Sequence, residues 1–153
     1  MSSHSVTVTI NGTTYEREVE ARKLLIHFVR DDLDLTGSHI GCDTGNCGAC
    51  SMIVNGTLVK GCMMLAVQAD GAAIETVEGL ADGDELTPLQ KSFSEHHALQ
   101  CGYCTPGMLM SATALLRDNP SPSEDEIRKA LQGNICRCTG YWNIFEAVKA
   151  VAK

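Results

Sequence analysis

The stretch Gly41-Cys-Asp-Thr-Gly-Asn-Cys-Gly-Ala-Cys50 contains three of the eight cysteines in this chain of 153 residues. The three are spaced Cys-x4-Cys-x2-Cys, and a fourth follows after eleven further residues. The remaining cysteines form two close pairs, Cys-x2-Cys and Cys-x-Cys. All the cysteines therefore fall into two groups of four. The N-terminal quartet is Cys42, Cys47, Cys50 and Cys62, and the C-terminal quartet is Cys101, Cys104, Cys136 and Cys138.

The N-terminal quartet has the spacing of a plant-type [2Fe–2S] ferredoxin loop. Such a cluster needs four soft thiolate ligands on two irons, so a short loop that supplies three of them must fold around it. Gly41, Gly45 and Gly48 suit this loop, because glycine accepts left-handed backbone angles and lets N–H groups approach the sulfurs. An apolar loop with buried free cysteines would not need this pattern. We therefore expect the N-terminal quartet to bind one cluster.

The C-terminal quartet leaves three interpretations open. Its spacing suits an iron–sulfur cluster, a zinc site, or a redox dithiol formed by Cys101 and Cys104 alone. The neighbouring ferredoxin-like quartet favours the cluster. Two clusters on one small chain predict a path for single electrons.

Hydrophobic periodicity predicts an α+β fold with two domains. Alternating residues and Asn-Gly turns indicate strands at 6–10, 13–19, 51–54, 58–60 and 73–77, with a short helix at 22–32. After residue 87 the pattern becomes helical, with four helices that begin near Thr87-Pro88, Thr105-Pro106, Ser123 and Gly140. We predict a ferredoxin-like domain at 1–78, a linker at 79–87 and a helical domain at 88–153. The C-terminal quartet lies at the junctions of the first two and of the last two helices.

Composition narrows the function classes. The formal net charge of −7 argues against binding to a nucleic-acid backbone, which requires a basic face. No apolar run is long enough to span a membrane, and no signal peptide is evident, so we expect a reducing cytoplasm, where clustered cysteines indicate metal binding. No catalytic triad, carboxylate pair or nucleotide-binding glycine motif is found, and the chain is expected to perform no substrate chemistry itself.

Three motifs carry a family resemblance. They are Gly41-Cys-Asp-Thr-Gly-Asn-Cys-Gly-Ala-Cys50, Gln100-Cys-Gly-Tyr-Cys-Thr-Pro-Gly107 and Gly133-Asn-Ile-Cys-Arg-Cys-Thr-Gly-Tyr141. Together they resemble the small iron–sulfur subunit of the molybdenum hydroxylase (xanthine oxidase) family, over nearly the whole chain. Leu24-Leu-Ile-His-Phe28 and Thr36-Gly-Ser-His-Ile-Gly-Cys-Asp43 look most similar to the small subunit of aerobic carbon monoxide dehydrogenase.

The resemblance implies a β-grasp [2Fe–2S] ferredoxin domain followed by a four-helix [2Fe–2S] domain. It implies two partners, a large subunit that binds a molybdenum–pterin cofactor and a medium subunit that binds FAD, assembled as a dimer of heterotrimers. Electrons would pass from molybdenum through both clusters to FAD. Gln100 and Cys138 match family residues that contact the pterin. The complex would be cytoplasmic, or peripheral at the inner face of the cell membrane.

The substrate belongs to the large subunit in this family. Carbon monoxide is the expected substrate on the resemblance, with aldehyde, xanthine or N-heteroaromatic substrates as alternatives. Two hypotheses of other classes remain beside the relay, a free-standing ferredoxin-like carrier and a zinc-stabilised interaction module.

Overall fold

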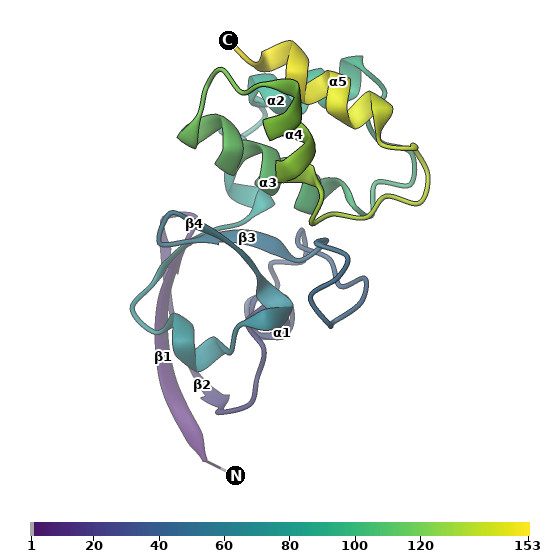
Figure 1. Cartoon of the computed structure of the whole chain (residues 1–153). Coiled ribbons are helices and arrows are strands. Elements are labelled where there is room, and N and C mark those ends of the chain that lie inside the picture. The colour runs from purple at the N-terminus through teal and green to yellow at the C-terminus, as the bar shows by residue number, and fades with distance from the viewer. Residues whose placement is uncertain (1) are drawn as a thin grey trace.

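The computed structural model describes residues 2–153, and its chain forms an N-terminal half built on a sheet and a C-terminal half built of helices (Figure 1). Strands β1 (Ser3–Ile10) and β2 (Thr13–Glu20) pair antiparallel around Asn11 and Gly12, whose φ angles of 51° and 83° fit a tight hairpin turn. β5 (Ala73–Glu75) runs parallel to β1, and the antiparallel hairpin of β3 (Ser51–Val54) and β4 (Thr57–Lys60) follows it. The strand order is β2-β1-β5-β3-β4.

The helix predicted at 22–32 begins later than expected and changes its winding. α1 (Leu25–His27) passes into a π-helical turn, η1 (Phe28–Asp32). Helix cannot start at residue 22 because this segment pairs with a distant one: the Leu25 N–H donates to Met64 C=O, and the Lys23 C=O accepts from Ala66 N–H. Phe28 and Val29 are then buried in a core with the inward side chains of β1.

Short 3₁₀ turns complete the N-terminal half, at η2 (Gly61–Met63), η3 (Ala66–Ala69) and η4 (Val77–Gly79). The strand predicted at 73–77 ends at Glu75, because the Thr76 N–H donates to the Asn11 side chain at 3.0 Å and leaves the ladder.

The four predicted helices of the second half are present. They are α2 (Pro88–Glu95), α3 (Thr105–Asp118), α4 (Glu124–Leu131) and α5 (Trp142–Val151). Thr87 with Gln90, and Ser123 with Glu126, form the capping boxes that start α2 and α4. Their buried faces make a second core around Phe93. The α+β class, with a ferredoxin-like sheet domain followed by a helical domain, is thus confirmed.

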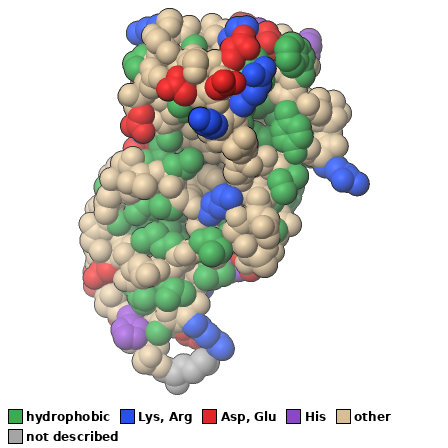
Figure 2. All heavy atoms as spheres, viewed as in Figure 1, with side chains coloured by type: hydrophobic (Ala, Val, Ile, Leu, Met, Phe, Trp, Pro, Cys, Tyr) green, Lys and Arg blue, Asp and Glu red, His purple; other side chains and the backbone are tan. Residues whose placement is uncertain are grey.

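The two halves pack through α3 and β3, and the chain termini lie at opposite ends (Figure 1). Arg117 of α3 donates two hydrogen bonds to the Glu75 carboxylate on β5, at 2.9 and 2.8 Å. Val77 and Leu80, from the segment that joins the halves, pack against the helical core. On the face in Figure 2, basic and acidic side chains lie intermixed over the helical half. No helix among residues 2–153 has the length and apolar character needed to cross a membrane.

Candidate metal centres

The loop between residues 41 and 50 wraps its backbone around the sulfur of Cys42. The N–H groups of Thr44, Asn46 and Cys47 point at Cys42 Sγ, at 3.4, 3.3 and 3.2 Å. The Gly45 N–H points at Cys62 Sγ, at 3.2 Å, and so links the loop to the end of the second hairpin. Left-handed backbone at Asp43, Gly45 and Gly48 turns the loop tightly enough for this convergence.

Hydrogen-bond donors lower the pKa of one thiol of the N-terminal quartet, whereas burial raises the pKa of another. The N–H groups of Thr44 and Cys47 stabilise the Cys42 thiolate and lower its pKa to about 6. Burial raises the pKa of Cys50 to about 12, and nearby Cys62 and Cys47 act on the same thiol. A thiolate at Cys50 therefore needs a positive partner, which a bound iron would supply.

The C-terminal quartet lies in two segments between helices, and three of its members, Cys101, Cys104 and Cys136, line one cavity. Cys101 and Cys104 lie between α2 and α3, with Cys104 as the N-cap residue of α3, and Cys136 and Cys138 lie between α4 and α5. Burial raises the pKa of Cys104 to about 12, and the neighbouring Cys136 and Cys101 raise it further. A helix N-terminus favours a thiolate, as expected from the sequence for Cys104. Burial outweighs this effect of the helix dipole, so that the pKa of Cys104 is raised.

The pKa of Cys136 is shifted in the opposite direction from that of Cys104. Burial raises its pKa, but hydrogen bonds from Thr139, at 3.0 Å from the sulfur, and from Cys104 lower it more, so that the net shift is downward. The adjacent thiols thus form an asymmetric pair, with the thiolate favoured on Cys136. Cys101 Sγ also accepts the Tyr103 N–H at 3.5 Å.

A cavity of about 160 Å³ lies between the quartets. Cys47 from the N-terminal quartet and Cys101, Cys104 and Cys136 from the C-terminal quartet line it together, along with Tyr103 and Ile135. The Ile135 N–H donates to the Cys47 C=O at 2.8 Å. One residue next to Cys136 therefore bonds directly to a residue of the other quartet.

The donor sets fit [2Fe–2S] clusters in their chemistry. Each quartet offers four soft sulfurs, and the N-terminal one is surrounded by N–H dipoles that suit a negatively charged group. No three His, Cys, Asp or Glu side chains of residues 2–153 are arranged to hold a single metal ion. A [2Fe–2S] cluster needs a different arrangement, because it distributes four thiolates over two irons.

Other contacts between the halves could not be predicted from spacing. His39 Nδ1 donates to the Tyr103 C=O at 2.8 Å, so this ring nitrogen carries the proton. The two rings stack with centroids 4.5 Å apart, and the Tyr103 hydroxyl donates to Ile40 C=O at 2.6 Å. The sequence shows that Tyr103 lies between Cys101 and Cys104. It does not show that Tyr103 contacts His39 and Ile40.

The residues expected to contact the pterin lie on the surface. Gln100, in the segment between α2 and Cys101, is exposed, and Cys138 is exposed as well. Gln100 directly precedes Cys101, and Cys138 is itself a member of the C-terminal quartet.

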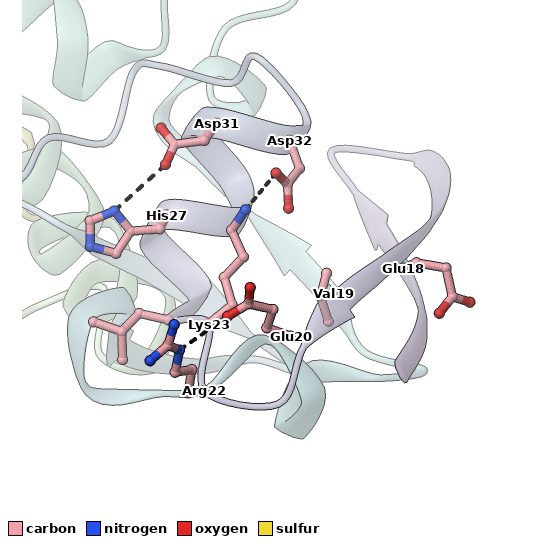
Figure 3. Close-up of a pocket in the computed structure, with 9 residues that line it drawn as sticks. Glu18, Val19, Glu20, Arg22, Lys23, His27, Asp31 and Asp32 are labelled. Atoms are coloured by element: carbon pink, nitrogen blue, oxygen red, sulfur yellow. Dashed lines mark hydrogen bonds and ion pairs between the residues drawn. The ribbon is translucent and has the colours of Figure 1, made fainter. Parts of the chain in front are cut away.

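A separate pocket of about 550 Å³ lies beside α1 and β2 and contains no cysteine (Figure 3). Its polar side chains largely pair with one another, as Lys23 with Asp32 at 2.5 Å and His27 with Asp31 at 3.7 Å. On its other ring nitrogen, His27 lies 3.0 Å from Asp43, beside Cys42. The His27–Asp43 contact thus joins this pocket to the start of the loop at residues 41–50.

Comparison with known proteins assigns each half. A family model described as "2Fe-2S iron-sulfur cluster binding domain" matches residues 8–81, and one described as "[2Fe-2S] binding domain" matches residues 76–149. The chain therefore carries two [2Fe–2S] binding domains.

Similar proteins cover almost the whole chain. Caffeine dehydrogenase subunit gamma of Pseudomonas sp. (strain CBB1) is 51% identical over 99% of this chain and 93% of its own length. The nicotine 6-hydroxylase small subunit of Paenarthrobacter nicotinovorans is 52% identical over 94% of this chain and 86% of its own length. In the solved structure of quinoline 2-oxidoreductase from Pseudomonas putida 86, one chain matches with a TM-score of 0.95 and 48% identity, covering 98% of this chain and 93% of that one. The chain belongs to the small [2Fe–2S] subunits of the molybdenum hydroxylase family.

Proposed function

We propose that this chain relays single electrons from a molybdenum–pterin site on a large partner subunit to FAD on a medium partner subunit. The two cysteine quartets are the proposed ligands of its two clusters. The observation that carries the proposal is the junction of the quartets, where the Cys47 C=O bonds to the Ile135 N–H at 2.8 Å across a shared cavity. Two separate binding modules would not need this direct contact.

The residues around the quartets have distinct tasks in this proposal. When bound, each [2Fe–2S] cluster accepts and releases one electron at a time. The N–H groups of the 41–50 loop stabilise negative charge on Cys42 and Cys62. The contacts of Tyr103 with His39 and Ile40 hold the C-terminal quartet against that loop. Gln100 and Cys138, both exposed, are the proposed contacts to the pterin.

The substrate of the assembly is proposed from the relatives. The names of three of them refer to caffeine, nicotine and quinoline, all nitrogen-containing aromatic rings. They favour an N-heteroaromatic substrate over the carbon monoxide that the sequence motifs suggested, with an aldehyde as a second candidate because aldehyde oxidoreductase subunits are also similar. The names "subunit gamma" and "small subunit" support the presence of partner subunits. As the family resemblance implies, we propose a large and a medium partner, assembled with this chain as a dimer of heterotrimers in the cytoplasm.

The test of the relay subunit is the composition of the purified complex together with low-temperature EPR after dithionite reduction. We expect about four irons per copy of this chain, two in each cluster, an equal amount of inorganic sulfide and two distinguishable [2Fe–2S] signals. One signal together with one equivalent of zinc would assign the C-terminal quartet to a structural site and would contradict the relay.

The same preparation separates the relay from a free-standing carrier. We expect large and medium chains, molybdenum and FAD to co-purify with this chain. A monomer that retains both clusters and reduces many acceptors without these partners would identify an independent ferredoxin-like carrier instead.

A further inference from the structure

Lys60 bonds to the cluster loop from outside the cysteine motifs. It is the last residue of β4, two positions before Cys62, and its Nζ donates to the Gly45 C=O at 2.7 Å. The side chain is half-buried. No carboxylate of residues 2–153 lies within 4.0 Å of its ammonium group, so the charge is not neutralised by an ion pair in that range.

The acceptor of this bond belongs to a peptide group that also faces a sulfur. The Gly45 C=O and the Asn46 N–H are the two ends of one peptide unit, and the Asn46 N–H points at Cys42 Sγ at 3.3 Å. Hydrogen bonds in a chain polarise one another, so a cation on the carbonyl strengthens donation from the N–H. One peptide group thus connects Lys60 to the sulfur of Cys42.

Lys60 lies close to both halves of the molecule. A Cβ placed on Gly133 would lie 3.6 Å from Lys60 Nζ and 3.7 Å from its Cε, so the side chain extends to the loop that leads to Cys136. Met63 packs against Gly45 itself, since a Cβ on Gly45 would lie 2.7 Å from the Met63 Sδ. The ammonium group therefore lies at the junction of the two halves, beside the N-terminal quartet.

We infer that Lys60 is a positioning residue that holds the Gly45–Asn46 peptide and raises the reduction potential of the N-terminal cluster relative to the C-terminal one. The inference rests on the proposed ligation of that cluster by the N-terminal quartet. Reduction adds one electron, and hence one negative charge, to the cluster, with dithionite or an electrode as the donor. A nearby positive charge and a stronger N–H donor both stabilise the reduced form, because net charge and hydrogen bonds to the sulfurs set the potentials of these centres.

The test is an EPR-monitored redox titration of the complex with the Lys60→Met variant. Methionine keeps an unbranched apolar stem but removes the charge and the donor. We expect the equilibrium constant for reduction of the N-terminal cluster to fall about tenfold, which corresponds to about 59 mV for one electron, with the C-terminal cluster unchanged. The signal that persists in a Cys104→Ala variant identifies the N-terminal cluster.

Two further variants serve as controls. Lys60→Arg retains a charged donor and is expected to keep the wild-type potential. Lys129→Met removes the same charge from an exposed position on α4 and is expected to change neither potential. Loss of the N-terminal cluster from Lys60→Met but not from Lys60→Arg would also support the inference, because the charged donor would then be required to hold the loop.

The contrary outcomes are distinct. An intact N-terminal cluster with an unchanged potential in Lys60→Met would overturn the role of Lys60 and leave the relay standing. Equal shifts of the N-terminal cluster's potential in Lys60→Met and Lys129→Met would show that only the net charge of the chain matters. That result would also overturn the role of Lys60. Absence of both [2Fe–2S] signals from the wild-type complex would instead refute the proposed function.

Discussion

Gly107 occupies a position where the two halves of the molecule touch backbone to backbone. A Cβ built on this residue of α3 would lie 2.1 Å from the Gly48 C=O, and Gly48 belongs to the cluster loop. A backbone atom cannot move aside like the end of a flexible side chain. The absence of one methyl group thus sets how closely the C-terminal quartet approaches the N-terminal one.

Gly107→Ala is therefore expected to destabilise the chain. Alanine is favoured over glycine inside a helix by roughly 1 kcal/mol, but overpacking a tight contact costs about 1–3 kcal/mol, and here it would also force the halves apart. Thermal unfolding of the cluster-loaded chain followed by circular dichroism should show a lower Tm. Gly133→Ala is the matched control, because its Cβ would meet only Lys60 atoms at 3.6 Å or more. A Tm of Gly107→Ala at or above that of Gly133→Ala would contradict the tight contact.

At the scale of elements, local signals determine where most helices begin. The capping boxes at Thr87 and Ser123 could be recognised from residue types three positions apart, and both are formed. The start of α1 could not be predicted in this way, because backbone groups near Lys23 bond to residues around 64–66. The same limit applies to the site: the quartets are visible as spacings, whereas the His39–Tyr103 contact joins residues 64 positions apart.

The capping box of α4 gives a prediction at this scale. Ser123 Oγ accepts the Glu126 N–H at 3.3 Å, and the Glu126 carboxylate accepts the Ser123 N–H at 2.7 Å. Ser123→Ala removes the cap and should cost about 1 kcal/mol, or roughly 2–4 °C in Tm for a chain of this size. Ser121→Ala, two residues earlier and exposed, is the control and should leave the Tm unchanged. Equal Tm values for the two variants would show that the cap contributes nothing.

At the scale of the whole molecule, the linker predicted at 79–87 is expected to be the segment most accessible to a protease. Residues 82–86 are exposed, although Leu80 packs against the helical core. Brief digestion with a glutamate-specific protease is expected to cut first after Glu85 and to give two fragments, identified by mass spectrometry. Glu78 is the internal comparison, because its carboxylate accepts the Gly37 N–H at 2.7 Å and ties that segment down. A first cut in the N-terminal sheet would contradict the predicted boundary.

The relay itself concerns the whole chain, since it requires both clusters in series. Cys104 is the residue to change, because it lies in the C-terminal quartet and is absent from the N-terminal core. Cys104→Ala should leave the N-terminal half folded, with its [2Fe–2S] signal unchanged, and should remove the second signal.

The most direct measurement is flavin reduction by the substrate of the molybdenum site, followed by stopped-flow absorbance in wild-type and Cys104→Ala complexes that contain equal molybdenum and FAD. If electrons pass through both clusters, the wild-type flavin is reduced and the Cys104→Ala flavin stays oxidised, although dithionite still reduces it. Flavin reduction by substrate at the wild-type rate in the Cys104→Ala complex would contradict the two-cluster relay.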